Sequence, residues 1–320
     1  MKLHSFLSKI RNKILRLLLG ESGYKVITHV NEHGSWYLIQ KYAPETKYPE
    51  ILCDWYFEKT GEKLNLEAPR TFNEKIQWLK LYDATPLKTR LSDKYLVRQW
   101  VADKIGEKYL IPLLGVWDSF DEIDFDLLPN QFVLKANHGS GWNIIVKDKS
   151  KFDRSEARKK FSVWMNTNFA YSICLELQYR DITPKILAEK YLEDKSGGLV
   201  DYKFYCFEGN PFNVGHYVDR YKKGGYKAVN YDMEWNPTPW TTEADHKPGI
   251  IIKKPEMFNE MLGLANTLCI GFHHVRVDFY LVNNQIYFGE MTFSSGSGLD
   301  QIEPDEWNRK LGDMIKLPTD

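Results

Sequence analysis

The chain has 320 residues, enough for one large domain or for several subdomains around a substantial core. Its 43 basic and 43 acidic residues cancel, so no overall field favours nucleic acid, and an anion must be bound by a local arrangement of charge. The four cysteines lie far apart and form no CxxC pair, which argues against a zinc site and a dense disulfide framework and indicates a cytoplasmic protein.

Residues 1–20 form the first predicted element, a basic amphipathic helix. Apolar residues such as Leu3, Leu7 and Ile10 recur at helical spacing, while lysines and arginines occupy the other angles. Charges interrupt the segment too often for a signal peptide or a membrane-spanning helix. Two interpretations stay open: the helix lies on the anionic inner face of a membrane, or it packs on its own domain or a partner.

Residues 21–110 are predicted to be mainly helical. Thr71, with Glu74 three residues later, forms a capping box that opens one helix, and Ser92 opens the next. After Pro129 the pattern changes to short β-rich runs. QFVLKA and NIIVK, separated by the glycine-rich HGSGW, predict a hairpin with a long, flexible loop.

Strands and helices then alternate in blocks. A helix is predicted over about residues 154–169, followed by strands in KILAEKYL, VDYKFYCFEG and PFNVGHYVD. A helix over about residues 255–270 leads into a hairpin of VRVDFYLV and QIYFGEMTF. This order favours an α+β fold over a regularly wound α/β fold.

Lys135 ends the predicted strand FVLKA and is followed by the glycine-rich loop of residues 137–141. A lysine on a rigid strand is a fixed point charge for phosphate, and glycines let backbone N–H groups approach phosphate oxygens closely. The pattern is neither a P-loop nor a dinucleotide fingerprint. An ordinary hairpin turn is the alternative.

The turn of the last predicted hairpin decides where its acidic residues lie. With a three-residue loop, Val282 pairs with Ile286, and Asp278 then lies opposite Glu290 on one face. A two-residue Asn-Asn turn would instead place the two carboxylates on opposite faces. The three-residue register also puts Arg276 opposite a threonine on the face that carries the acids.

Two carboxylates facing each other need a counter-ion, because like charges opposite one another destabilise a sheet. A hard, oxygen-binding cation such as Mg²⁺ fits better than a lysine, since it can bridge Asp278 and Glu290. Ordinary positions on the solvent face of a hairpin are the alternative for each acid alone.

Two further segments carry candidate ligand contacts. The aliphatic strand that ends in Glu189, Lys190, Tyr191 and Leu192 could offer backbone groups to a flat base, with acidic side chains beyond it for ribose hydroxyls. On the next strand, Asp201 and Lys203 are alternate residues and share a face. The lysine could bind phosphate while the aspartate orients it, and a surface ion pair is the alternative.

Taken together and in this order, six segments resemble the ATP-grasp superfamily and, within it, the teichuronopeptide-biosynthesis (TupA-like) branch. They are FNEKIQWLKLYD, LSDKYLVR, FVLKANHGSG, ILAEKYLED, DYKFYCFEGNP and VRVDFYLVNNQIYFGEMTFSSGSG, and the resemblance covers about residues 50 to 305. The resemblance implies an α+β ATP-grasp fold, with a nucleotide between two α+β subdomains and a helical N-terminal region over 21–110. The smaller subdomain would cover residues 111–185, and the larger would cover 186–320.

The resemblance also implies roles for individual residues. Lysines would contact phosphates, the loop of residues 137–143 would cover the γ-phosphate, the strand end would line the adenine pocket, and two acids would ligate Mg²⁺. The implied nucleotide-binding residues are Lys94, Lys135, His138, Gly139, Ser140, Gly141, Glu189, Lys190, Tyr191, Leu192, Asp194, Asp201 and Lys203. The implied metal ligands are Asp278, Glu290 and Thr292, and the implied catalytic residues are Lys203, Arg276 and Ser295.

Two positions depart from the family pattern. Many ATP-grasp ligases have Asn two residues after the metal-binding Glu, but Thr292 stands here, so a second metal ligand is weaker or is supplied by water. The ribose acid is ambiguous between Glu193 and Asp194. Ser295 follows the metal strand in a serine- and glycine-rich run that could hold an acyl phosphate, with a flexible loop as the alternative.

The implied function is an ATP- and Mg²⁺-dependent carboxylate–amine ligase of bacterial surface polysaccharide biosynthesis. It would join an amino acid to a uronic acid or other acidic sugar, in the cytoplasm or at the inner membrane face through residues 1–20. One rival is a glycosyltransferase of the same pathway, supported by Asp124-Phe125-Asp126, although no aliphatic strand leads into that DxD. A non-catalytic nucleotide-binding protein is the other.

Overall fold

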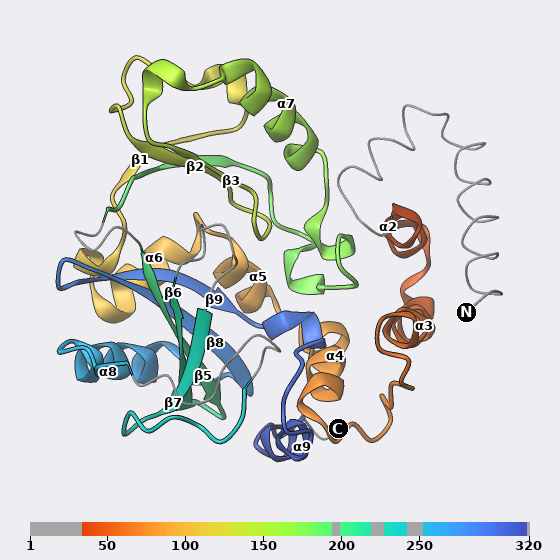
Figure 1. Ribbon diagram of the computed structural model, residues 1–320. Helices are drawn as coiled ribbons and strands as arrows, with labels where there is room; N and C mark the ends of the chain where they lie inside the picture. Colours follow the sequence, from red (N-terminus) through yellow and green to blue (C-terminus); the bar gives the residue numbers. More distant parts are fainter. Residues whose placement is uncertain (1–33, 194–198, 219–226, 242–251, 319–320) are drawn as a thin grey trace.

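The computed structural model describes residues 34–193, 199–218, 227–241 and 252–318 (Figure 1). The predicted amphipathic helix of residues 1–20 and the candidate ribose residue Asp194 lie outside the described residues. Within the described ranges, no helix is long and apolar enough to cross a membrane.

Helices come first in the described chain. They are α2 (Gly34–Tyr42), α3 (Tyr48–Thr60), α4 (Phe72–Tyr82), α5 (Pro86–Ser92) and α6 (Val97–Ile105). The smaller sheet and its helix follow, as β1 (Leu113–Trp117), β2 (Phe132–Ala136), β3 (Asn143–Val146), α7 (Arg154–Met165) and β4 (Ile186–Lys190). The rest are β5 (Val200–Phe207), β6 (Asn210–Val218), β7 (Lys227–Asp232), α8 (Phe258–Leu268), β8 (His274–Val282), β9 (Gln285–Thr292) and α9 (Glu306–Asp313).

Short 3₁₀ turns connect these elements. They are η1 (Glu45–Lys47), η2 (Glu107–Tyr109), η3 (Phe120–Glu122), η4 (Lys149–Lys151), η5 (Phe169–Tyr171), η6 (Leu177–Tyr179) and η7 (Ser295–Gly298).

The smaller sheet is antiparallel, with strand order β1-β4-β2-β3. In Figure 1 α7 crosses the face that is turned away from the larger sheet, and Phe132 and Phe161 are fully buried in the core between them. β4 pairs with β1 and β2, and its Ile186 and Ala188 belong to the same core. The smaller subdomain therefore continues to Lys190, past the expected boundary at residue 185.

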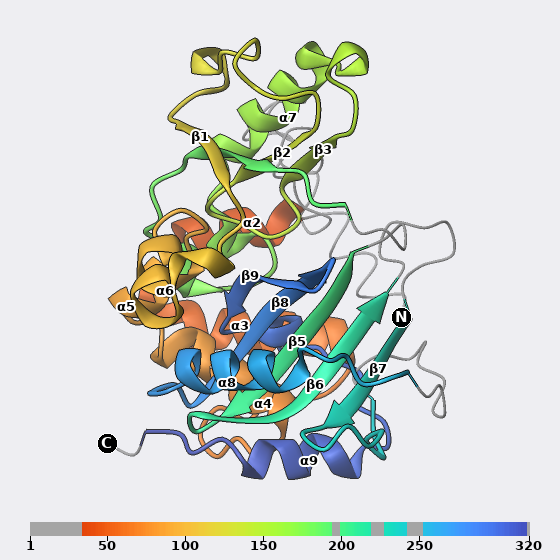
Figure 2. The same cartoon turned by 90° about the vertical axis from the view of Figure 1, so that its left-hand side faces the viewer.

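The larger sheet is antiparallel, with strand order β7-β6-β5-β8-β9. Its two faces are set by the strand period of two. Phe204 of β5 packs toward α8, whereas Tyr205 and Phe207 belong to the cluster of α4 and α9. Figure 2 shows α8 in front of the sheet, with α4 behind it and α9 below.

One predicted helix start is confirmed and one is wrong. The Thr71 side chain accepts from the Glu74 backbone N–H while Glu74 caps Thr71 in return, which is the expected capping box. Ser92, by contrast, ends α5, and α6 begins only at Val97. Asp93 holds the turn between the two helices. Its Oδ1 accepts hydrogen bonds from the backbone N–H groups of Tyr95 at 2.7 Å and Leu96 at 3.2 Å.

Candidate functional site

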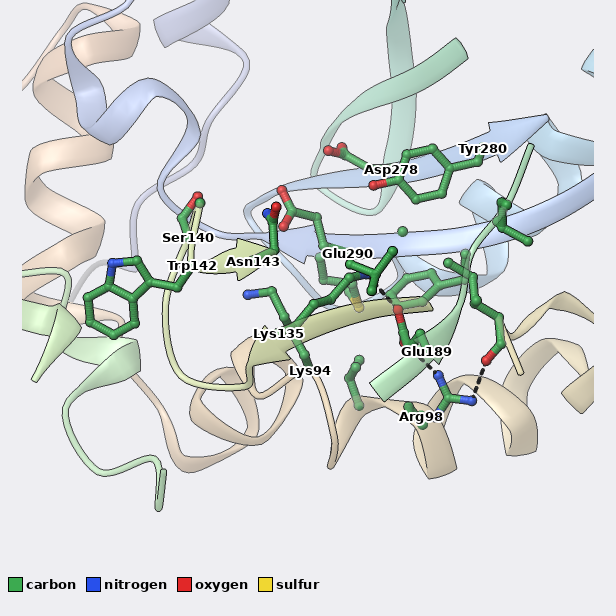
Figure 3. Close-up of a pocket in the computed structure, with 18 of the residues that line it drawn as sticks. Lys94, Arg98, Lys135, Ser140, Trp142, Asn143, Glu189, Asp278, Tyr280 and Glu290 are labelled. Atoms are coloured by element: carbon green, nitrogen blue, oxygen red, sulfur yellow. Dashed lines mark hydrogen bonds and ion pairs between the residues drawn. The ribbon is translucent and has the colours of Figure 1, made fainter. Parts of the chain in front are cut away.

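A cavity of about 470 Å³ lies between the two sheets (Figure 3). Its walls come from the smaller sheet, from strands β8 and β9 of the larger sheet, and from the segment that joins α5 to α6. The sequence-predicted site residues that line it are Lys94, Lys135, Ser140, Gly141, Glu189, Lys190, Tyr191, Leu192, Asp278 and Glu290. Segments almost 200 residues apart in the sequence thus meet in one place.

The β8–β9 hairpin brings its two acids together by a route that the sequence prediction missed. Asp278 lies opposite Glu290, as expected. Of the two loop lengths left open by the sequence, the structure has the shorter: Val282 pairs with Gln285 across a two-residue Asn-Asn turn whose residues have φ of 50° and 62°. Such positive φ values are typical of the turn that suits a tight hairpin.

A β-bulge at Gly289 restores the pairing of the acids. Phe279 lies opposite Phe288 while Asp278 lies opposite Glu290, so one extra residue stands in β9. That residue has little room for a side chain, since a Cβ on Gly289 would lie 3.1 Å from the carbonyl oxygen of Asp278. The short turn shifts the register by one residue and the bulge shifts it back. Asp278 and Glu290 therefore lie on the same face of the sheet.

Arg276 is the counter-ion of this acid pair in the structure. Its Nε and Nη2 donate to the two oxygens of Asp278, each at 2.8 Å. Nη2 also donates to Glu290 at 3.0 Å and to the hydroxyl of Thr292 at 3.1 Å, and that hydroxyl donates to Glu290 at 3.1 Å. Lys203 of β5 adds a second positive charge, with its Nζ 3.7 Å from Asp278.

The positive charges around Glu290 keep it ionised. Burial alone would raise the pKa of Glu290, but Arg276, Lys94 and Lys203 outweigh burial and lower that pKa to about 2. The carboxylate is therefore charged at any physiological pH.

The acid pair fits a magnesium ion that binds together with a phosphate ligand. Among the described residues there is no group of three or more His, Cys, Asp or Glu that could hold a metal on its own. Mg²⁺ commonly takes one or two carboxylates and completes its shell with substrate phosphates and water. Asp278 and Glu290 both line the cavity and meet that requirement. Thr292 is engaged with Arg276 and Glu290 and is not among the lining residues.

Of the three lysines that line the cavity, Lys94 and Lys135 are each held by another group of the chain. Lys94 donates its backbone N–H to Asn137 at 3.1 Å and its ammonium to the carbonyl oxygen of Gly139, so it is tied to the glycine-rich loop. Burial lowers the pKa of Lys94, and neighbouring Lys135 lowers it further against the opposing effect of Glu290. A buried ammonium group has already lost most of its hydrating water, so binding an anion costs little further desolvation.

Lys135 forms an ion pair with Glu189, with Nζ and Oε2 2.6 Å apart. The other oxygen of Glu189 accepts from Arg98 at 3.0 Å, and Arg98 also donates to the carbonyl oxygen of Ile111 at 2.7 Å. The carboxylate of Glu189 is thus neutralised from both sides. Arg98 was missed at the sequence level: it closes the quoted segment LSDKYLVR, but no spacing rule pairs it with an acid 91 residues away.

One end of the cavity is apolar. Ile111, Leu192, Leu199 and Tyr280 pack together there, and all four line the cavity. This is the end at which the sequence predicted a pocket for a flat base, with the backbone of β4 running along its wall.

Several predicted site residues lie outside the cavity lining. Both ring nitrogens of His138 are bonded within the protein, to Asn137 at 3.1 Å and to the carbonyl oxygen of Trp164 at 3.0 Å. Ser295 is fully buried and its hydroxyl is hydrogen-bonded to His274 at 3.1 Å. Neither side chain is therefore free for a ligand.

The remaining predicted residues sit close to the cavity without lining it. Gly139 is buried and contributes its carbonyl oxygen to Lys94. Asp201 and Lys203 are buried on β5, and Lys203 reaches the site through Asp278. Arg276 donates to both acids and does not line the cavity.

The sequence matches the family described as TupA-like ATPgrasp over residues 74–316. The chain belongs to the TupA-like ATP-grasp family. Its α+β class and ATP-grasp fold, both predicted from the sequence, are confirmed by this match and by the two antiparallel sheets.

Solved structures similar to this ATP-grasp chain include several ligases. D-alanine–D-alanine ligase from Bacillus anthracis in complex with ATP is 14% identical over 92% of this chain and 93% of that one, with a TM-score of 0.41. L-amino acid ligase from Bacillus licheniformis is 12% identical over 80% of this chain and 55% of that one, with a TM-score of 0.42.

N5-carboxyaminoimidazole synthase from Aspergillus clavatus is 12% identical over 68% of this chain and 46% of that one, with a TM-score of 0.36. This chain thus spans about half the length of the last two proteins. TM-scores of this size support no inference about the chain. No curated protein matches it in sequence.

Proposed function

We propose that the protein is an ATP- and Mg²⁺-dependent carboxylate–amine ligase that joins an amino acid to a uronic acid or other acidic sugar of a bacterial surface polysaccharide. One observation carries the proposal. Two lysines, Lys94 and Lys135, and two acids, Asp278 and Glu290, line a single cavity that has an apolar end. A nucleoside triphosphate requires positive charges for its phosphates, carboxylates for its metal ion and an apolar surface for its base.

Each part of the cavity has a place in nucleotide binding. The base fits the apolar end along β4, and the phosphates extend toward Lys94, Lys135 and the glycine-rich loop. Asp278 and Glu290 would hold Mg²⁺, which when bound supplies positive charge to the phosphate oxygens. Lys135 must then exchange Glu189 for phosphate, while Arg98 keeps Glu189 neutralised.

The proposed reaction has two steps. An acceptor carboxylate oxygen forms a bond to the γ-phosphorus while the bond from that phosphorus to ADP breaks, giving an acyl phosphate. The amine nitrogen then attacks the acyl carbon, the carbon–oxygen bond to phosphate breaks, and the nitrogen loses a proton to give an amide. The chain's part is mainly charge neutralisation. Lys135 lines the cavity, and Lys203 and Arg276 add positive charge beside Asp278.

The acidic glycan comes from the family resemblance, and contact of residues 1–20 with the inner membrane face comes from their basic amphipathic pattern. Co-sedimentation with anionic vesicles that is unchanged by deleting residues 1–20 would remove the membrane part of the proposal.

The rival glycosyltransferase loses its main support in the structure. Asp124 and Asp126 are exposed, Asp124 accepts the backbone N–H of Asp126 at 3.0 Å, and neither lines the cavity. Phe125 between them is buried in the core of the smaller sheet. The DxD is therefore a surface turn whose phenylalanine anchors it.

Release of ADP from ATP in the presence of an acidic glycan and pooled amino acids tests the function. Glu290→Gln removes one of the two carboxylates, so we expect turnover to fall at least about a hundredfold. Glu256→Gln makes the same chemical change at an exposed position and should leave turnover unchanged. Undiminished turnover in Glu290→Gln would exclude Glu290 from the metal site.

A further inference from the structure

Three aromatic side chains form a continuous wall, which we call the aromatic wall: Trp142, Phe169 and Tyr179. The ring centroids of Trp142 and Phe169 lie 5.2 Å apart, and those of Phe169 and Tyr179 lie 4.9 Å apart. Phe169 is buried, whereas Trp142 and Tyr179 are only partly buried and both line the cavity. Phe169 thus serves as the support on which the two outer rings rest.

The aromatic wall stands at the end of the cavity opposite the apolar base end. Figure 3 shows the order along the cavity: Arg98 and Tyr280 lie toward one side, and Ser140 and Trp142 toward the other, with Lys94, Lys135 and Glu290 between them. Ser140 and Asn143 beside the indole are exposed, so this end opens to solvent. A nucleotide with its base at the apolar end would fill the cavity up to the lysines and leave the aromatic wall uncovered.

Tyr179 lines the same cavity as Glu290 and is close enough to be affected by its charge. Burial, together with the charges of Glu176 and Glu290, raises the pKa of Tyr179 well above its usual value. The phenol therefore keeps its proton and remains a hydrogen-bond donor within the cavity.

The N-terminal helices hold the segment that carries the wall. The backbone N–H of Asn168 donates to the hydroxyl of Tyr37 at 3.0 Å, and that of Leu175 donates to Gln40 at 3.0 Å. Arg180, next to Tyr179, pairs with Glu45 at 2.7 Å. These three contacts come from residues before position 74, where the family match begins.

We infer that the aromatic wall is the subsite for the carboxylate acceptor, and this inference rests on the proposed function. In-line transfer requires the attacking oxygen to approach the γ-phosphorus from the side opposite ADP. With ADP extending from the base end, that side is the one that Trp142 and Tyr179 line.

The chemistry of the wall selects a ring-shaped acid. The face of an aromatic ring carries partial negative charge and attracts the slightly positive C–H groups on one face of a saturated sugar ring. The phenol of Tyr179 can donate to a ring hydroxyl. A small open-chain acid offers no comparable flat face, so we expect it to bind this subsite more weakly.

The test compares Trp142→Ala, Trp142→Phe and Tyr179→Phe with wild type, using methyl glucuronide as the ring acid and glutamate as the open-chain acid. Two quantities are measured for each variant. They are the affinity for ADP in the presence of Mg²⁺, and the KM for the acid in ADP release from ATP with pooled amino acids that lack glutamate and aspartate. Trp142→Ala should raise the KM for methyl glucuronide by about tenfold, with a smaller increase in Tyr179→Phe. Affinity for ADP should stay within about twofold of wild type.

Trp164→Phe is the matched control, because Trp164 stacks on Trp142 at 6.3 Å between centroids and does not line the cavity. It should leave the KM for methyl glucuronide unchanged. Trp142→Phe keeps an aromatic face and should raise the KM less than Trp142→Ala does. The inference is overturned if Trp142→Ala and Trp164→Phe behave alike, if Trp142→Ala weakens ADP binding as much as acceptor use, or if wild type binds ADP but does not prefer methyl glucuronide to glutamate. A wild type that binds no ADP with Mg²⁺ would instead overturn the proposed function, and the inference with it.

Discussion

At the residue scale, Arg276 supplies the main hydrogen bonds and a balancing positive charge to the acid pair when no nucleotide is bound. It donates to both oxygens of Asp278 and also to Glu290. Together with Lys203, 3.7 Å from Asp278, it balances the charge of the two carboxylates without a metal ion. A divalent ion that binds the same oxygens must therefore compete with the guanidinium. The sequence indicated a counter-ion for these acids, and the structure adds that the chain supplies one of its own.

Replacing Arg276 by Gln should make the protein less stable and more responsive to Mg²⁺. The change leaves Asp278 buried without its main partner, which we expect to cost about 3 kcal/mol of unfolding free energy. Mg²⁺ alone should then raise the melting temperature of Arg276→Gln more than that of wild type, because the ion no longer competes with the guanidinium. Thermal unfolding with and without Mg²⁺ measures both effects.

Arg309→Gln, at an exposed position, is the control and should behave like wild type. If Mg²⁺ stabilises Arg276→Gln no more than wild type, Arg276 does not occupy the metal position.

Two buried histidines make stability depend on pH. Burial lowers the pKa of His216 to about 4 and, with smaller effects of Lys88 and Arg276, that of His274 to about 3. Unfolding returns each pKa to about 6.5, so below that pH the unfolded chain binds more protons than the folded one. The unfolding free energy should therefore fall as pH decreases from about 6.5 to about 4, by on the order of 3 kcal/mol for each group.

Denaturant unfolding across this pH range measures the effect. His216→Phe keeps an aromatic ring that cannot titrate and should reduce the slope. An identical slope in wild type and variant would contradict neutral burial of His216.

At the element scale, the β8–β9 hairpin marks what the sequence could and could not predict. Alternating apolar residues predicted both strands, and the pairing of Asp278 with Glu290 was predicted correctly. The length of the turn was left open between two and three residues, and the bulge at Gly289 was not predicted at all. A glycine in a strand permits a bulge, but whether one forms depends on cross-strand neighbours that a single sequence does not reveal.

Gly289→Ala tests the role of the bulge. The new Cβ would lie 3.1 Å from the carbonyl oxygen of Asp278, so the strands must shift at the position that aligns the acids. We expect a loss of about 1 kcal/mol in unfolding free energy and a several-fold weaker affinity for ADP with Mg²⁺. Calorimetric titration and denaturant unfolding give the two values.

Gly263→Ala in α8 is the matched control, since a Cβ there meets nothing within 4 Å. It should leave ADP affinity unchanged and stabilise the helix slightly. Equal ADP affinity in Gly289→Ala and wild type would show that the bulge is not needed to place the acids.

Helix ends and long-range pairs were harder to predict. The Thr71 capping box is local and was predicted, because both partners lie within one turn. The start of α6 was misplaced because Asp93, and not Ser92, supplies the side chain that holds the preceding turn. Arg98 escaped prediction since its partner Glu189 belongs to a distant strand.

At the scale of the whole molecule, the site exists only because two antiparallel sheets enclose one cavity. The sequence indicated the fold class and every charged residue of the cavity lining except Arg98, since strand patterns and the family resemblance place residues on elements. The sequence alone could not show which polar side chains make all their hydrogen bonds within the protein and which remain available to a ligand. His138 and Ser295 both looked available, yet each is bonded to a neighbour that becomes adjacent only on folding.

The dependence of ADP affinity on Mg²⁺, compared between wild type and Asp278→Asn, tests most directly whether the acid pair and the lysines serve one nucleotide. Calorimetric titration of ADP with and without Mg²⁺ gives the four affinities. The account predicts that Mg²⁺ tightens ADP binding to wild type by about tenfold or more and has little effect on Asp278→Asn, because the aspartate is one of two carboxylates available to the ion. Equal tightening by Mg²⁺ in both proteins would contradict it.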